Sequence, residues 1–202
     1  MTSAPPPVIA AFDFDCTITD RDTLYPFLLF TTGRFPAYWK ILKAVPKATG
    51  ALFKQNHRQY IKEEFLEEFF SGRSVEEMWK LGKAYAQGPL LNYIKPAAMK
   101  QIQWHKEQGH QCILISASLD IYLYPWSASA GFDHAICSSL SFDSAGYITG
   151  HLHGLNCRGP EKVRRLLELT GPKENFILYA YGDSAGDREL LALADHPYYR
   201  KF

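Results

Sequence analysis

Two aspartates separated by a single residue follow an apolar segment near the start of the chain. Residues 8–12 are apolar throughout, which favours a strand buried on both faces of a parallel sheet, and Asp13 and Asp15 come directly after it. In open α/β sheets, ligands bind at the edge where such strands end. Two neighbouring carboxylates repel each other unless a cation or a proton compensates them. The pair therefore indicates either a cation-binding catalytic edge or an acidic loop in solvent.

A second acidic turn follows another apolar segment near the end of the sequence. Residues 176–181 lead into a glycine-rich stretch that contains Asp183 and Asp187, and a helix is expected directly after it. These two acids can share one side of a helical turn, although Asp187 can equally serve as an N-terminal cap. If both acidic turns meet at one sheet edge, four carboxylates converge there. Such an all-oxygen ligand set is suited to Mg²⁺.

A hydroxyl and a basic residue complete the candidate chemistry. Ser116 and Ala117 follow a third apolar segment, residues 111–115, where a hydroxyl and the free N–H groups of a following helix can hold an anion. An ordinary helix cap formed by Ser116 or Ser118 is the alternative. Pro160 is suited to the first turn of a helix, which places Lys162 in that turn. A lysine there either contacts an anion or is a solvated surface residue.

Taken in order, these four segments resemble the haloacid dehalogenase superfamily, and within it subfamily IB, whose members are similar to phosphoserine phosphatases. The family pattern is Asp-x-Asp-x-Thr, a strand-end Ser or Thr, a Lys, and Gly-Asp-x-x-x-Asp, and here it extends from Asp13 to Asp187. The resemblance implies an α/β fold, with a Rossmann-like core of a parallel sheet flanked by helices and an inserted helical cap of the C1 type. We expect residues 1–20 and 91–202 to form the catalytic core and residues 21–90 to form the cap.

The resemblance also implies roles for the acidic residues. Asp13 is expected to be the nucleophile that forms an aspartyl-phosphate, and Asp15 the general acid and base. Mg²⁺ is expected to bind a carboxylate oxygen of Asp13, the backbone carbonyl of Asp15, and Asp183. Asp187 is expected to support the metal shell or Lys162.

Ser116 and Lys162 are expected to contact the phosphoryl group. Ala117, which stands in the place of a frequent glycine, is expected to line the substrate site beside Ser116. Depending on one gap, Arg158 rather than Lys162 falls at the lysine position of the motif, and the spacing to Asp183 favours Lys162.

Other positions distinguish the chain from parts of the superfamily. The dehalogenases of the superfamily lack the equivalent of Asp15 and need no metal. The ion-pumping members have membrane spans, whereas the longest charge-free apolar stretch of this chain, residues 23–33, is too short to cross a bilayer. Cys16 stands where the family usually has Gly or Ser. Gly186 stands where phosphoserine phosphatases have an Asn near the phosphate.

The expected cap contains four candidate helices separated by glycines: residues 23–32, 35–48, 56–70 and 74–87, with Gly33, Gly50, Gly72 and Gly88 between or after them. In the resembling family the cap closes over the active site and reads the leaving group. Asp22 lies where phosphoserine phosphatases keep a Glu that meets the substrate amine. Arg58, and after it Lys62, is the nearest candidate for a cap cation that binds the substrate carboxylate.

The first two cap segments also combine large apolar side chains with lysines. The apolar ones are Leu24, Tyr25, Phe27, Leu28, Leu29, Phe30, Phe35, Tyr38 and Trp39, and the lysines are Lys40, Lys43 and Lys47. This mixture is suited to a membrane interface, and it is similar to bacterial phosphatidylglycerophosphatases of type C, which belong to the same branch. The alternative, which we favour from sequence, is a cap whose aromatic residues pack into a small core of its own.

Composition excludes some partners. The 202 residues are 47% apolar, enough for one sizeable core, and the net charge of +1 does not indicate nucleic-acid binding. The four cysteines, at positions 16, 112, 137 and 157, lack the spacing of metal ligands. Residues 1–7 lack the basic and apolar regions of a signal peptide and are expected to form a short lead-in. We therefore expect a cytoplasmic protein. The oligomeric state is not indicated.

The sequence thus predicts a Mg²⁺-dependent phosphatase that hydrolyses a phosphate monoester, with a small phosphorylated metabolite as the favoured substrate. The alternatives are a lipid-phosphate phosphatase, a phosphotransferase of the same chemistry, and a regulatory protein that binds phosphate without turnover. Asp15 argues against the last, because a protein that only holds phosphate needs no acid and base.

Overall fold

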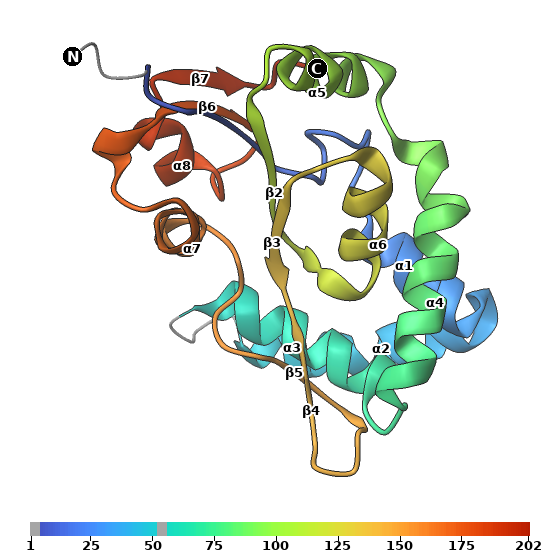
Figure 1. Cartoon of the computed structure of the whole chain (residues 1–202). Helices are drawn as coiled ribbons and strands as arrows, with labels where there is room; N and C mark the ends of the chain where they lie inside the picture. Colours follow the sequence, from blue (N-terminus) through green and yellow to red (C-terminus); the bar gives the residue numbers. More distant parts are fainter. Residues whose placement is uncertain (1–4, 52–55) are drawn as a thin grey trace.

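A five-stranded parallel sheet forms the centre of the molecule (Figure 1). The computed structural model describes residues 5–51 and 56–202. Across the sheet the strands run in the order β3 (His134–Ser138), β2 (Gln111–Leu119), β1 (Val8–Phe12), β6 (Ile177–Gly182) and β7 (His196–Tyr199), and each neighbouring pair is parallel. The ends of β1, β2 and β6 therefore meet at one edge, which brings the two acidic turns and Ser116 together.

Helices cover both faces of the sheet. α5 (Pro96–Glu107) and α6 (Asp120–Ala130) pack on one face, and α7 (Pro160–Thr170) and α8 (Arg188–Leu193) pack on the other (Figure 1). Successive side chains of a strand point to opposite faces. Along β1, Ala10 and Phe12 accordingly join the core beneath α5 and α6, whereas Ile9 and Ala11 join the core beneath α7 and α8. This explains why β1 is apolar at every position.

The remaining helices are inserted between β1 and α5. They are α1 (Leu24–Thr32), α2 (Arg34–Ala51), α3 (His57–Phe70) and α4 (Val75–Gln87), followed by the short 3₁₀ helix η1 (Pro89–Tyr93). α2 packs along α3, and α4 packs against α6. A second 3₁₀ helix, η2 (Lys173–Asn175), precedes β6.

An antiparallel hairpin of β4 (Leu140–Phe142) and β5 (Ile148–Leu152) packs against α3. At this contact a Cβ atom on Gly150 would lie 2.3 Å from Cα of Glu67, so only glycine fits there. The β4–β5 hairpin, which the sequence-based division assigns to the core, thus packs against the inserted helix α3. That division, residues 21–90 against the rest, stays a prediction.

The parallel sheet flanked by helices confirms the predicted α/β fold class, and the predicted strands correspond to β1, β2 and β6. Two boundaries were predicted wrongly. α2 continues through Gly50 instead of ending before it, since a single glycine in a helix costs only about 1 kcal/mol. β2 continues to Leu119, so Ser116 lies within the strand rather than after it. The predicted lead-in, residues 1–7, falls largely on residues 1–4, outside the described residues.

Candidate active site

Asp13 and Lys162 form a buried ion pair at the end of β1. Nζ of Lys162 lies 2.5 Å from Oδ1 of Asp13 and 2.7 Å from Oδ1 of Asp187. The lysine comes from the first turn of α7, which Pro160 begins, and only 2% of its surface is exposed. Burial opposes the charge of Lys162, but the two facing carboxylates raise its pKa above the usual value. The structure therefore brings Lys162, and not Arg158, to the end of β1.

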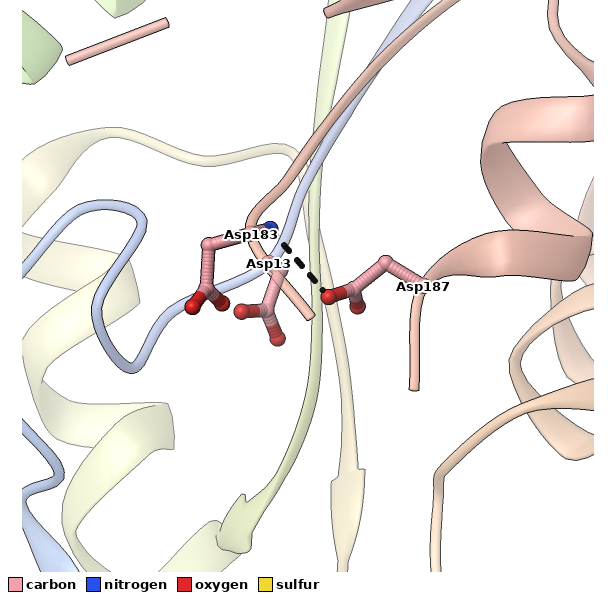
Figure 2. Close-up of side chains that lie close together, drawn as sticks. All are labelled: Asp13, Asp183 and Asp187. Atoms are coloured by element: carbon pink, nitrogen blue, oxygen red, sulfur yellow. Dashed lines mark hydrogen bonds between the residues drawn. The ribbon is translucent and has the colours of Figure 1, made fainter. Parts of the chain in front are cut away.

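Three carboxylates converge beside this lysine. Asp13, Asp183 and Asp187 each offer an oxygen, and these atoms lie within 4.8 Å of one another (Figure 2). Burial raises the pKa of Asp13 to about 7, against the attraction of Lys162, and burial also raises the pKa of Asp183. The three carboxylates therefore carry more negative charge than Lys162 compensates by itself. A divalent cation would compensate it, so these residues fit the Mg²⁺ that the family pattern implies.

The three acids differ in what else they contact. The hydroxyl of Thr17 donates to Oδ2 of Asp13 at 3.1 Å and lies 3.5 Å from Oδ1 of Asp183. Asp187 is committed to the protein, because its Oδ2 accepts from the backbone N–H groups of Asp183 and Ser184, at 3.3 and 3.0 Å, and from the Ser184 hydroxyl (Figure 2 shows the Asp183 bond). Although Asp187 occupies the position before α8, its side chain makes no helix-capping bond. Asp13 and Asp183 are thus the carboxylates that remain open to a cation.

Asp15 does not join this cluster. Its Oδ1 accepts hydrogen bonds from the backbone N–H of Thr23 at 2.8 Å and from the Thr23 hydroxyl at 2.6 Å, and its Oδ2 accepts from the hydroxyl of Ser118. Burial, reinforced by the charge of Asp22, raises the pKa of Asp15 to about 6, while the hydrogen bonds act in the opposite direction. The side chain can therefore carry or release a proton near neutral pH. Only the backbone carbonyl of Asp15 is left as its candidate metal ligand.

Strand β2 supplies the hydroxyl of Ser116, two residues before the Ser118 that contacts Asp15. Ser116 is buried, and its Oγ accepts the N–H of Ser118 at 3.0 Å. Because that bond uses an acceptor site of the hydroxyl, its proton remains available for an anion. Neither serine caps α6, whose first turn lacks a side-chain cap. Ala117 lies between them, with its carbonyl accepting a 2.5 Å hydrogen bond from Nζ of Lys62 on α3.

A cavity of about 640 Å³ opens beside Asp15. Polar and charged side chains on its wall include Asp22, Arg58, Lys62, Ser118, Asn156 and Arg158. Its apolar wall comes from α1 and α3, through Leu24, Tyr25, Leu28, Ile61 and Phe65. Asp22 and Arg58, predicted from sequence to read the leaving group, thus lie on one cavity. Asp22 also accepts the N–H of Leu24 at 2.9 Å and so helps to begin α1.

Arg158 occupies the space above Gly186. A Cβ atom on Gly186 would lie 2.4 Å from Nη1 of Arg158, so a larger residue at position 186 would displace this arginine. Arg158 lines the cavity beside Asp15 and also a neighbouring cavity of about 550 Å³. The guanidinium of Arg158 thus lies beside Gly186, the position at which the resemblance to phosphoserine phosphatases leads us to expect an asparagine.

Cys16 adopts a φ of 58°, in the left-handed region. Glycine enters this region without strain, which explains the family preference for a small residue here. The turn is held by the N–H of Cys16, which contacts Oγ1 of Thr19 at 3.2 Å.

Sequence reasoning missed the two residues that hold the carboxylate of Asp15. The sequence pattern predicts only that Thr23 begins a helix and that Ser118 is a possible cap. The available signal for Thr23 was its position, as a polar residue directly before the apolar segment of α1. Sequence spacing alone does not connect Thr23 or Ser118 to Asp15.

Comparison with known proteins places the chain in a family. The model of the haloacid dehalogenase-like hydrolase family matches residues 10–192. Protein CicA of Caulobacter vibrioides is 33% identical over 197 residues, covering 97% of this chain and 87% of CicA. A histidinol-phosphatase of Neisseria meningitidis is 24% identical over 203 residues, covering 94% of this chain and 88% of that protein.

Solved structures share the fold. A protein of unknown function from Bordetella pertussis has a TM-score of 0.79 and 22% identity, with coverage of 96% of this chain and 89% of that one. A phosphoserine phosphatase in the form of a phospho-aspartyl intermediate analogue has a TM-score of 0.60 and 20% identity, with coverage of 94% and 84%. With its ordered motifs at one sheet edge, the chain belongs to the haloacid dehalogenase-like hydrolase family and has the fold of its phosphoserine-phosphatase-like members.

Proposed function

We propose that this hydrolase is a Mg²⁺-dependent phosphatase that cleaves the phosphate monoester of a small metabolite through a covalent intermediate on Asp13. The observation that carries the proposal is the buried contact of Lys162 with Asp13, beside the carboxylate of Asp183 and apart from that of Asp15. A nucleophile, a compensating cation and an acid–base group thus lie at one sheet edge as separate groups. The phosphatase relatives support the same chemistry.

In the first step, a carboxylate oxygen of Asp13 bonds to phosphorus while the bond from phosphorus to the leaving oxygen breaks. Asp15 gives its proton to that oxygen, so the leaving group departs as an alcohol. The raised pKa of Asp15, about 6, keeps part of the enzyme in this protonated form near neutral pH. The cavity beside Asp15 then receives the leaving group.

In the second step, water attacks phosphorus while Asp15 takes up its proton. The bond between phosphorus and Asp13 breaks, its electron pair returns to the carboxylate, and phosphate leaves. Throughout, Lys162 and the hydroxyl of Ser116 hold phosphoryl oxygens, which is the positioning that phosphoryl transfer requires. Asp187 orients Lys162 through the 2.7 Å contact.

The carboxylates of Asp13 and Asp183 and the backbone carbonyl of Asp15 would hold Mg²⁺. When bound, the cation supplies the positive charge that lets an anionic nucleophile approach an anionic phosphate.

Phosphate release from p-nitrophenyl phosphate tests the reaction, with added Mg²⁺ and after chelation. We expect turnover that depends on Mg²⁺ and is abolished in Asp13→Asn, which keeps the shape of the side chain. Absence of release from folded protein, or wild-type turnover in Asp13→Asn, would refute the proposal. Labelling of the chain by phosphate without turnover would favour the regulatory alternative.

A lipid phosphate is the second candidate substrate. The observation that favours it is the apolar wall that α1 and α3 give the cavity, which also contains the basic side chains of Arg58, Lys62 and Arg158. A screen that includes histidinol phosphate, phosphoserine, sugar phosphates and phosphatidylglycerophosphate distinguishes the two classes. A kcat/KM at least tenfold higher for lipid phosphates than for every soluble compound would displace the small-metabolite assignment.

A further inference from the structure

α2 buries its small side chains and exposes its large apolar ones. Its fully or largely buried apolar residues are Ala37, Ala44 and Ala48. Its exposed apolar residues, with the exposed fraction of each, are Phe35 (89%), Tyr38 (71%), Trp39 (65%), Leu42 (55%) and Val45 (43%). A helix that only completed a core would show the opposite distribution. The sequence-based expectation that these aromatic side chains pack into the cap therefore fails on α2.

The exposed residues form one continuous strip. Their spacing follows i, i+3, i+4, i+7 and i+10 from Phe35, so they share one side of a helix with 3.6 residues per turn. The alanines lie on the opposite side, against α3. Contiguous apolar strips of this kind on a protein surface usually mark a contact with another protein or with a membrane.

The charges around the strip select between these partners. No Asp or Glu occurs between residues 23 and 62, whereas this stretch contains seven basic residues: Arg34, Lys40, Lys43, Lys47, Lys54, Arg58 and Lys62. Arg58 and Lys62 line the cavity beside Asp15 and are not part of the surface around the strip. On α2 itself, Lys43 and Lys47 lie on one flank of the strip and Arg34 on the other. Lys40 is used internally, since its ammonium donates to the carbonyl of Glu68 and lies 5.6 Å from the ring centre of Phe69 on α3.

We propose that the exposed face of α2 lies in the interface of an anionic lipid bilayer. A helix with Trp, Phe and Leu on one face and Lys or Arg beside them binds at the boundary between headgroups and acyl chains. A second copy of the chain would place two basic surfaces against each other, which the charge disfavours. The contact is peripheral, because no helix among the described residues is long and apolar enough to cross a membrane. This inference does not depend on the proposed reaction.

Sedimentation with vesicles tests the proposal. We expect the wild-type protein to bind vesicles of phosphatidylcholine with added phosphatidylglycerol, to bind phosphatidylcholine alone far less, and to lose binding as salt is raised. The triple variant Phe35→Ser, Tyr38→Ser, Trp39→Ser should bind at least about tenfold more weakly. The charge variant Lys43→Glu, Lys47→Glu should lose the preference for anionic vesicles.

Phe142→Ser is the matched control, since this aromatic side chain is 62% exposed and belongs to β4 rather than to α2. It should bind vesicles as the wild type does. All four proteins should release phosphate from p-nitrophenyl phosphate alike, because none of the changed residues lines the cavity beside Asp15. If no phosphatase activity exists, circular dichroism and unfolding midpoints verify the fold instead.

Three results would overturn the proposal. The first is failure of the wild type to bind anionic vesicles, and the second is equal binding by the wild type and the triple variant. The third is a dimer, measured by light scattering, that the triple substitution converts to a monomer while neither protein binds vesicles.

Discussion

Nζ of Lys162 lies 2.5 Å from Oδ1 of Asp13 across 149 residues of sequence, and both side chains are almost completely buried. This contact joins the first turn of α7 to the end of β1. It holds the candidate nucleophile in one orientation and offsets its charge. The same ammonium contacts Asp187 at 2.7 Å, so one cation serves two carboxylates.

Replacing Lys162 should therefore harm both stability and catalysis. Lys162→Met leaves the carboxylates of Asp13 and Asp187 buried without the ammonium that contacts both, and we expect a loss of about 3–5 kcal/mol in the free energy of unfolding near neutral pH. Any folded fraction should show a kcat at least about 100-fold lower, because a group that stabilises the transferred phosphoryl is lost. Asp13→Asn should destabilise the protein less, since Lys162 keeps Asp187. Denaturant unfolding and p-nitrophenyl phosphate turnover check both effects. Equal stability of Lys162→Met and wild type would show that the ion pair is not formed.

The carboxylate of Asp183 should lower the stability of the metal-free protein and contribute to Mg²⁺ binding. Its carboxylate lies among those of Asp13 and Asp187, so Asp183→Asn relieves repulsion while keeping the shape of the side chain. Without metal, we expect this variant to be more stable than the wild type by about 1 kcal/mol. With Mg²⁺, it should need a higher concentration both for activity and for an increase in Tm. Melting curves across a Mg²⁺ titration measure these changes, and an unaltered Mg²⁺ requirement would remove Asp183 from the ligand set.

Thr23 should act as a positioning residue for Asp15. Thr23→Val removes the 2.6 Å hydroxyl donor to Oδ1 but keeps the volume and the backbone donor. A misplaced acid slows departure of a poor leaving group more than departure of p-nitrophenolate, which needs no proton. We expect kcat/KM to fall about tenfold for an alkyl phosphate and little for p-nitrophenyl phosphate. A merely structural defect would lower both equally, and that outcome would contradict the role. Ser118→Ala, which removes the donor to Oδ2, should behave in the same way.

The sequence predicted the parts of this site that depend on local pattern. Uninterrupted apolar segments before Asp13 and Asp183 indicated buried parallel strands, and the ends of such strands necessarily share an edge. The sequence favoured Lys162 over Arg158 by its spacing to Asp183 but did not decide between them, because one gap moves either residue into the motif. The structure distinguishes them, since the first turn of α7 carries Lys162 to Asp13 while Arg158 lies over Gly186.

Contacts between distant residues were beyond prediction. Ser118 lies 103 residues from Asp15, and nothing in its local sequence indicates which carboxylate its hydroxyl meets. The face that α2 exposes was equally hidden. Alanines and aromatic residues both count as apolar in a helical pattern, so periodicity could not show that Ala37 and Ala44 are buried while Phe35 is exposed.

Because of Lys62, the free energy of unfolding should change with pH in the alkaline range. Burial lowers the pKa of this lysine to about 8 in the folded protein, where its ammonium donates to the carbonyl of Ala117. The unfolded chain, with an ordinary lysine pKa of about 10.4, binds more protons between these values, so the free energy of unfolding should rise with pH from about 8 to 10.4. Lys62→Met should lack this rise, about 1–3 kcal/mol in size. Unfolding midpoints at several pH values measure it, and Lys83→Met corrects for the loss of an exposed lysine. Parallel curves for wild type and Lys62→Met would contradict the prediction.

Gly82 should be required for the packing of α4 on α6. A Cβ atom at this position would lie 2.0 Å from the backbone carbonyl oxygen of Ile121, so the two helices must separate to admit it. Gly82→Ala should therefore destabilise the protein by about 2 kcal/mol, although alanine is the better helix former by about 1 kcal/mol. Gly50→Ala is the matched change in α2, where an added Cβ atom would meet nothing within 4 Å among the described residues beyond its own helix, and it should stabilise by up to about 1 kcal/mol. Chemical denaturation gives both values. Stabilisation by both substitutions would mean that α4 does not approach α6 this closely.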